Sequence, residues 1–405
     1  MFPGRGIPAL SRENPYRRLR FGSPSRTVPA LAPGVRVALV TEYYYPHLGG
    51  VVEHVHHFAR ELRRRGHHVD IITSRIPGAP ERDGVVRIGR SLPWYINGSY
   101  SRITIGRDVR GEMRRVLRDG DYDLVHVHSP LTPVLPLLAI EEAEVPVIGT
   151  FHTYFDRSVG YGVLQKFFQR RLDKLSAAIA VSQSTIVALE RYFDADWRII
   201  PNGVDTEAFT PHAPKPAAMP RDVPVILFLG RFDPRNGLGT LIDAFRKVRG
   251  RGRRARLVIV GDGPLRSHYL ARANGHPDIM FAGPVLDERP GYYAHADIYA
   301  CPTTKASFGI TLLEAMACRT PIVCSDILGF RDVVVHGREA WMVPSNDVEA
   351  LSNALVHLLD DEPLRRRLGA EGIRRARAYD WTAVTDQVLG IYDEVLSPAP
   401  IPLGI

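Results

Sequence analysis

The sequence predicts an α/β protein built from two Rossmann-like domains that face each other across a cleft. Three observations support this fold class. Short apolar runs of strand type alternate with amphipathic helical segments, which is the pattern of a parallel, doubly wound sheet. A proline-rich stretch at 206–223 interrupts the alternation, and the same pattern restarts after it. A length of 405 residues suffices for two or three domains with cores of their own.

The first half of the chain predicts one domain at 34–208. A strand at 35–41 precedes a loop that ends in Gly49-Gly50 and a helix at 51–65 that stops at Gly66. Further strands are expected at 69–73, 85–88, 124–128, 147–149, 178–181 and 197–200. Because parallel strands point the same way, their carboxyl ends form the edge where such folds bind ligands.

The second half repeats this plan after a linker at 209–223, where prolines fall in polar, alanine-rich sequence. The second domain, 224–380, begins with a strand at 225–229, a glycine-bearing loop at 230–239 and a helix at 240–248. Its other strands are expected at 257–260, 279–282, 297–300, 321–324 and 340–343. A last helix lies at 382–396, and segment 381–398 is expected to return to the first domain.

The composition is that of a soluble globular protein. Hydrophobic residues at 45% and charged residues at 24% exclude a wholly disordered or fibrous chain. Three cysteines are too few for a disulfide framework and indicate a reducing compartment. The longest apolar run, 131–140, is about half as long as a spanning helix, and the first residues lack the apolar core of an export signal. We therefore expect a cytoplasmic protein.

Basic residues, which give a net charge of +8, gather in two segments. Residues 1–33 carry six arginines against one acidic residue and read as a basic disordered tail. A second segment predicts an amphipathic helix at 107–118 with one basic face, formed by Arg107, Arg110, Arg114 and Arg118. Such a face suits an anionic membrane surface, and a solvated face explains the pattern equally well. Nucleic acid is not expected, because no zinc, helix-turn-helix or aromatic-basic RNA motif accompanies the charge.

Three loops carry the candidate chemistry. Gly49-Gly50 lies at the start of the first helix, where glycines let backbone amides approach a phosphate, although any tight turn could use them. Arg231 follows the first strand of the second half, with Arg235 nearby, and arginines there can clamp a diphosphate or lie on a surface turn. Ser307-Phe308-Gly309-Ile310 opens a helix that carries Glu314, whose carboxylate can accept both ribose hydroxyls of a nucleotide.

Together with further motifs in the same order along the chain, these loops resemble the retaining GT-B glycosyltransferases of family four, and among them the phosphatidylinositol mannosyltransferases. The resemblance covers about residues 35–396. The matching runs are Gly49-Gly50-Val51, Ile96-Asn97-Gly98-Ser99, Asp123 to His128, Thr150-Phe151-His152-Thr153, Ile200 to Asp205, Leu227 to Arg231, Ser307 to Ala317, and Tyr379-Asp380-Trp381.

The resemblance implies a GT-B enzyme that transfers a sugar with retention, mannose being favoured, from a nucleotide-diphosphate sugar to a membrane lipid such as phosphatidylinositol or to a polyol. GDP-mannose is the favoured donor and a UDP-sugar is possible, with no further cofactor. The departing diphosphate takes the acceptor proton, so no protein nucleophile is needed. The enzyme would be cytoplasmic and peripheral on the inner face of the membrane.

The resemblance also implies roles for single residues. Gly50 and Arg231 would approach the donor diphosphate, His152 would face the transferred sugar, and Glu314 would bind the ribose. The acceptor head group would contact Asn97, Ser99 and Arg102. The basic helix at 107–118 matches the segment that these enzymes lay on anionic membrane, which favours the membrane interpretation of its four arginines.

The chain departs from the family pattern at two positions. Asn236 stands where the family has a lysine that stabilises the leaving diphosphate, and Ala306 stands where it has a glutamate that faces the sugar. Arg235 or Lys305 could replace the lysine charge, but neither replaces the carboxylate. A catalytically impaired protein that binds nucleotide sugar or serves as a scaffold is therefore the alternative hypothesis. The histidines show no zinc-site spacing along the chain, so no metal is expected.

Overall fold

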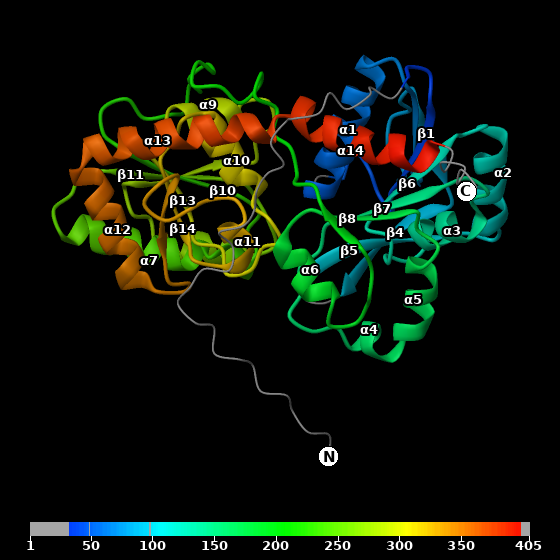
Figure 1. The fold of residues 1–405 in the computed structure, drawn as a ribbon. Coiled ribbons are helices and arrows are strands. Elements are labelled where there is room, and N and C mark those ends of the chain that lie inside the picture. Colours follow the sequence, from blue (N-terminus) through cyan, green and yellow to red (C-terminus); the bar gives the residue numbers. More distant parts are fainter. Residues whose placement is uncertain (1–31, 48, 97–98, 398–405) are drawn as a thin grey trace.

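The computed structural model describes residues 32–47, 49–96 and 99–397 and contains two α/β domains side by side (Figure 1). The first domain is built on a seven-stranded parallel sheet in the order β3-β2-β1-β6-β7-β8-β9. Its strands are β1 (Arg36–Val40), β2 (His68–Ser74), β3 (Val85–Ile88), β6 (Leu124–His128), β7 (Val147–Phe151), β8 (Ala177–Ala180) and β9 (Trp197–Ile199). The predicted tail at 1–33 lies almost entirely outside the described residues.

The second domain has a six-stranded parallel sheet in the order β12-β11-β10-β13-β14-β15. Its strands are β10 (Val225–Leu229), β11 (Arg256–Val260), β12 (Ile279–Gly283), β13 (Ile298–Cys301), β14 (Ile322–Ser325) and β15 (Ala340–Val343). In each sheet the strand order reverses beside the first strand, at β1/β6 and at β10/β13. Loops diverge at such a point and leave a ligand crevice. The two parallel sheets confirm the predicted fold class.

Helices cover both faces of the two sheets (Figure 1). In the first domain they are α1 (Gly50–Arg64), α2 (Val109–Asp119), α3 (Leu135–Glu142), α4 (Val159–Val163), α5 (Gln165–Leu172) and α6 (Gln183–Leu189). After β10 they are α7 (Leu238–Gly250), α8 (Arg266–Ala273), α9 (Arg289–Ala294), α10 (Ile310–Ala317), α11 (Leu328–Arg331), α12 (Val348–Asp360), α13 (Glu362–Ala376) and α14 (Trp381–Leu396). Among the helices described, none combines the length and the apolar character that crossing a bilayer requires.

The last helix leaves the second domain and packs on the first. Trp381, Val384 and Val388 of α14 are buried in one cluster with Val55 and Phe58 of α1. Figure 1 shows α14 (red) lying along α1. Because only a short turn at 377–380 separates α14 from α13, α14 ties the two domains together.

The segment between β3 and α2 differs from the sequence expectation. It forms an antiparallel hairpin of β4 (Arg90–Ile96) and β5 (Ser99–Ile105), which the sequence analysis did not predict. The predicted basic helix at 107–118 is also too long at its start, since α2 begins at Val109. The Asp108 side chain accepts a hydrogen bond from the backbone N–H of Gly111 at 2.9 Å and caps the helix. Arg107 therefore precedes the helix.

Candidate active site

The glycine loop of the first domain meets the start of α10 in the second. Gly50 is the first residue of α1, and a Cβ placed on it would lie 3.2 Å from Cδ1 of Ile310, the first residue of α10. Both helix N-termini therefore lie where the two domains meet. Because the N-terminal end of a helix carries unpaired N–H groups and partial positive charge, this junction suits an anionic group.

The loop before α10 has a backbone that only glycine tolerates. Gly309 has a φ of 130°, and a Cβ there would lie 3.0 Å from Cδ1 of Phe330. The neighbouring Phe308 is 3% exposed and packs in the core, with its ring centroid 6.1 Å from that of Tyr379. Phe308 belongs to the predicted donor-binding segment 307–310, and its side chain supports this loop from inside the protein.

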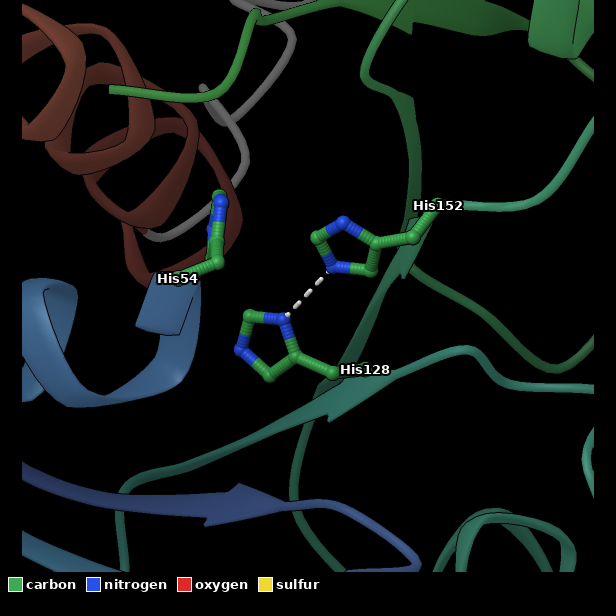
Figure 2. A group of neighbouring side chains, drawn as sticks. All are labelled: His54, His128 and His152. Carbon is green, nitrogen blue, oxygen red and sulfur yellow. Dashed lines mark hydrogen bonds between the residues drawn. The ribbon is translucent and has the colours of Figure 1, made fainter. Parts of the chain in front are cut away.

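Three histidines that are distant in the sequence meet in the first domain, as Figure 2 shows. His54 lies on α1, His128 ends β6 and His152 follows β7, and all three are buried. Nδ1 of His128 lies 3.2 Å from Nε2 of His152, and the ring centroids of His54 and His152 lie 4.7 Å apart. Nδ1 of His54 lies 2.9 Å from Oδ1 of Asn202, so the amide orients that ring. The predicted sugar-facing His152 is thus held by a network from three elements.

The histidine network is uncharged at neutral pH. Burial lowers the pKa of His54 to about 4, and burial also lowers the pKa of His128 and of His152 well below their ordinary value. His152 can therefore donate or accept a hydrogen bond but does not supply a positive charge. One nitrogen from each of the three rings lies within 4.8 Å of the other two. Zinc ligands at about 2.0–2.1 Å from the ion lie roughly 3.3 Å apart, so the rings would have to move closer together to bind zinc.

The arginines predicted for the donor and for the acceptor both act on His47. Arg231 follows β10, and Arg102 lies on β5, where its Nε donates to Oγ of Ser91 at 2.7 Å. Burial lowers the pKa of His47, in the loop after β1, and the charges of Arg102 and Arg231 lower it further. Because charge effects weaken with distance, both arginines lie in the surroundings of His47. This region suits a ligand with phosphate groups.

Asn236 adds no charge to the Arg231 loop but stiffens it. Its Nδ2 donates to the carbonyl oxygen of Arg231 at 2.7 Å. The carbonyl oxygen of Arg235 accepts from the backbone N of Thr304 at 2.7 Å and from its Oγ1 at 3.2 Å. The loop at 231–236 is therefore held against the segment that leads into α10.

The two cations that could replace the family lysine both have carboxylate partners. Lys305 forms an ion pair with Asp156 of the first domain, across the cleft. Nε of Arg235 lies 3.2 Å from Oδ1 of Asp233. Ala306, between Lys305 and the glycine turn, is partly buried against the core of the second domain. Positive charge is thus present next to the predicted donor site, although it is partly balanced.

Glu314 is buried on α10 and belongs to a charged network that spans both domains. Its Oε2 accepts from the hydroxyl of Tyr293 at 2.9 Å, and its Oε1 lies 3.4 Å from Nη1 of Arg289. Nη2 of Arg289 lies 3.7 Å from Oε2 of Glu53 on α1. Burial raises the pKa of Glu314, and the charge of Arg289 opposes that rise. No motif in the sequence marks Arg289, because its partners lie on other elements.

The segment before α10 is also bound to the first domain through α6. The hydroxyls of Ser182 and Ser184 donate to the carbonyl oxygen of Ser307 at 2.6 and 2.8 Å. The backbone N of Ser184 donates to Oδ2 of Asp332 at 3.1 Å, and burial raises the pKa of Asp332 to about 6. Both serines are buried, so these bonds fix the spacing of the two domains beside the predicted donor site.

The predicted acceptor segment lies on the β4–β5 hairpin. Arg102 lies on β5 and Ser99 is its first residue, described for its backbone alone, while Asn97 lies outside the described residues. The structure therefore describes one of the three predicted acceptor side chains, Arg102, whose charge acts on His47 as that of Arg231 does.

A buried carboxylate, Glu42, anchors this hairpin. Its Oε1 accepts from the backbone N of Thr104 at 2.5 Å and from its Oγ1 at 2.6 Å. Its Oε2 accepts from the backbone N of Val134 at 2.7 Å and of Leu135 at 2.8 Å. Burial raises the pKa of Glu42 to about 7. An acidic residue straight after an apolar strand is the signal that could have identified Glu42 from the sequence.

The predicted membrane arginines are largely paired with acids. Arg110 forms ion pairs with Glu141 and Glu142 of α3, and Nε of Arg114 lies 2.7 Å from Oε2 of Glu142. Arg118 pairs with the neighbouring Asp119 at 3.1 Å. The periodicity of a single helix does not reveal partners on the next helix, so the net charge of this face is lower than the sequence suggests.

Known proteins match both halves of the chain. Residues 48–208 match Glycosyltransferase Family 4, and residues 223–361 match Glycosyl transferases group 1. The phosphatidyl-myo-inositol mannosyltransferase of Mycobacterium leprae (strain TN) is 36% identical over 365 residues, which is 89% of this chain and 97% of that protein. The enzyme of the same name from Mycolicibacterium smegmatis is 35% identical over 367 residues, 89% of this chain and 94% of that protein.

Among solved structures, a sucrose-phosphate synthase from Thermosynechococcus elongatus superposes with a TM-score of 0.71 at 22% identity, over 89% of this chain and 98% of that one. This likeness supports the GT-B fold. Since the mannosyltransferases match nearly end to end at 35–36% identity, the chain belongs to the phosphatidyl-myo-inositol mannosyltransferase family of glycosyltransferases.

Proposed function

We propose that this protein transfers mannose from GDP-mannose to phosphatidylinositol at the cytoplasmic surface of a membrane, with retention at the sugar. The observation that carries the proposal is the 36% identity, over 89% of the chain, to a phosphatidyl-myo-inositol mannosyltransferase. The two arginines around His47, Arg102 and Arg231, support it, because the donor diphosphate and the acceptor phosphate both need positive charge nearby.

On the donor side, the diphosphate would lie between the N-termini of α1 and α10, with Arg231 beside it, and Glu314 would accept the ribose hydroxyls. The departing diphosphate takes the proton of the acceptor hydroxyl. Arg231 and the helix ends stabilise the negative charge that develops there, which is the electrostatic contribution that such sites supply. Neutral His152 would orient the sugar through a hydrogen bond. No resident metal or other cofactor is part of this proposal.

On the acceptor side, the head group would lie along the β4–β5 hairpin. Arg102 would bind its phosphate, and Asn97 and Ser99 would bind inositol hydroxyls. Glu42 positions the hairpin without touching the ligand. Because Arg102 and Arg231 both act on His47, the acceptor phosphate and the donor diphosphate would bind in neighbouring positions, as direct transfer between them requires.

The scaffold alternative gains no support from the relatives, which carry the names of enzymes. Asn236 supports the Arg231 loop through its hydrogen bond, and Lys305 and Arg235 keep positive charge near the donor site. We therefore treat Ala306 and Asn236 as adjustments of the donor site. Whether they slow transfer is tested by restoring the family residues with Ala306→Glu and Asn236→Lys.

The decisive experiment offers the purified chain a panel of GDP- and UDP-sugars with phosphatidylinositol. We expect a mannosylated lipid from GDP-mannose, identified by mass spectrometry, with the α configuration by NMR. Arg231→Ala should lower kcat by about 100-fold or more, because a group that stabilises the developing negative charge in such a site contributes about 2.7–4 kcal/mol to transition-state stabilisation. Arg266→Ala, on the exposed surface of α8, is the matched control. Donor binding without transfer to any lipid would favour the scaffold and overturn the proposal.

A further inference from the structure

The densest group of exposed apolar side chains lies on α4 and α5. Nine large hydrophobic residues are exposed in the part of the chain that the structure describes, and four of them fall within nine residues. Their exposed fractions are 83% for Val159, 76% for Val163, 47% for Leu164 and 42% for Phe167. Single exposed hydrophobic residues are common, but a cluster of this kind marks an interaction surface.

The exposure is imposed by the packing of the two helices. Tyr161 points inward, with its ring centroid 5.2 Å from each of Phe155, Phe168 and Phe193. The Ser158 side chain caps α4 by accepting from the backbone N of Tyr161 at 3.2 Å. Helical hydrogen bonds, from 164 to 160 and from 168 to 164, continue across the break between α4 and α5. The valines cannot turn inward without moving this aromatic cluster into water.

Basic side chains surround the apolar cluster. Segment 156–174 contains five basic and two acidic residues, and one of the acidic residues, Asp156, is paired with Lys305. Four of the basic residues are exposed, namely Arg157, Lys166, Arg170 and Lys174. Apolar residues bordered by Lys and Arg are typical of segments that lie in the interface of an anionic bilayer. Lysine is depleted in protein–protein interfaces, which favours a lipid partner over a protein.

The apolar cluster lies close in the chain to the predicted sugar-facing His152. Six residues separate His152 from Val159, so α4 begins within about 25 Å of that histidine even if the connection is fully extended. Figure 1 shows α4 and α5 projecting from the lower end of the first domain. Glu141 of α3 pairs with Arg171 of α5 and with Arg110 of α2, so this surface is continuous with the basic arginines of α2.

We propose that the α4–α5 surface, formed by Val159, Val163, Leu164 and Phe167, inserts into the headgroup region of an anionic phospholipid membrane. Arg157, Lys166 and Arg170 lie on the surrounding headgroups. The delivery of a lipid acceptor to the cleft rests on the proposed function, whereas the insertion itself does not. Apolar contact then supplies binding that salt does not screen, while the acid-paired arginines of α2 supply a smaller, salt-sensitive part.

Flotation of the full chain with vesicles of phosphatidylcholine and phosphatidylinositol tests the insertion. The triple variant Val159→Ser, Val163→Ser and Leu164→Ser should lower partitioning by at least about tenfold at 0.5 M NaCl, since three apolar side chains lose their burial in lipid. The matched control is Leu270→Ser, Leu286→Ser and Val335→Ser, which removes three exposed hydrophobic residues of the second domain and should bind like the wild type. Equal binding of the triple variant would overturn the proposal.

A second measurement reports insertion directly. A dye attached through Val163→Cys labels one site, because the three native cysteines are buried, and its emission should shift to the blue when vesicles are added. An unshifted emission would refute insertion. Sedimentation without lipid tests whether the surface instead contacts a second copy of this chain. If the wild type were a dimer and the triple variant a monomer, the surface would be a dimer interface, and the lipid proposal would be overturned.

Transfer assays separate this proposal from the proposed function. The triple variant should keep wild-type kcat/KM with a short-chain, monomeric phosphatidylinositol and lose at least about tenfold with vesicles, since only the second substrate requires docking. Loss on both substrates would show damage to the site and count against the docking role. If the wild type mannosylates neither substrate, the proposed function fails while the flotation and dye measurements still decide whether the surface inserts.

Discussion

Replacing Arg289 by alanine should affect donor binding and stability with opposite dependences on pH. Arg289 is the charge that compensates buried Glu314, at 3.4 Å, and it also reaches Glu53 of the first domain at 3.7 Å. In Arg289→Ala, Glu314 keeps the Tyr293 hydroxyl but loses its cation. Because burial already raises the pKa of Glu314, removal of the charge that opposes this rise must raise that pKa further.

The magnitude follows from the geometry. At an effective dielectric constant of 20, a pair 3.4 Å apart attracts by about 5 kcal/mol, and breaking buried pairs typically costs about 3–5 kcal/mol. Arg289 is 24% exposed and its contacts exceed hydrogen-bond length, so we expect a loss of about 2–3 kcal/mol in the free energy of unfolding. Loss of one charged hydrogen bond to ribose, about 1.5–3 kcal/mol, should weaken GDP-mannose binding by about 10- to 100-fold at neutral pH.

The pH dependence provides the signature. With the folded-state pKa of Glu314 raised above its unfolded value, the folded protein binds the proton more tightly, so stability falls as pH rises through that interval. Donor affinity should instead recover as pH rises, because ionised Glu314 accepts both ribose hydroxyls. Urea unfolding and calorimetry with GDP-mannose at several pH values measure both. Glu53→Gln should leave donor affinity near wild type, and Arg266→Ala should change neither quantity. Unchanged affinity and stability in Arg289→Ala at every pH would refute the reasoning.

Three further predictions concern the support of the site. Glu42→Gln places an amide N–H₂ among four hydrogen-bond donors, so KM for phosphatidylinositol should rise with unchanged donor affinity, and an unchanged KM would contradict this. The wild type loses stability as pH rises from the ordinary carboxylate pKa to about 7, because burial raises the pKa of Glu42, and the variant should lack this pH dependence. Gly237→Ala should lower the free energy of unfolding by at least about 2 kcal/mol, since φ is 69° and a Cβ would lie 2.1 Å from the Pro302 carbonyl oxygen. Gly230→Ala, where a Cβ would have no neighbour within 3.4 Å, is the control and should lower it far less, as thermal unfolding would measure. The four predicted membrane arginines are Arg107, Arg110, Arg114 and Arg118. Their replacement by glutamine should weaken vesicle flotation at 0.1 M NaCl but hardly at 0.5 M NaCl, and an equal loss at both salt concentrations would show that they do more than attract lipid electrostatically.

The two-domain α/β fold could be predicted from the sequence, because it follows from local pattern. A continuous apolar run such as 225–229 must be a buried strand, and the repeat of strand, loop and helix after the proline-rich linker implies a second sheet. The motif residues Gly50, Arg231 and Glu314 were also identifiable, since Gly50 lies at a helix start, Arg231 follows a strand end, and Glu314 lies on the helix after the Ser307–Gly309 turn. The β4–β5 hairpin was not, because both of its strands mix polar and apolar residues.

The tertiary structure decided which side chains meet. His54, His128 and His152 form one buried network only because α1 begins, and β6 and β7 end, at the same edge of the sheet. Arg289 finds Glu314 and Glu53 from different elements and both domains, and the arginines of α2 find acids on α3. The outward face of α4 follows from the aromatic cluster beneath it. These contacts join residues far apart in the chain, and local periodicity carries no information about pairs that only the packing of sheets and domains brings together.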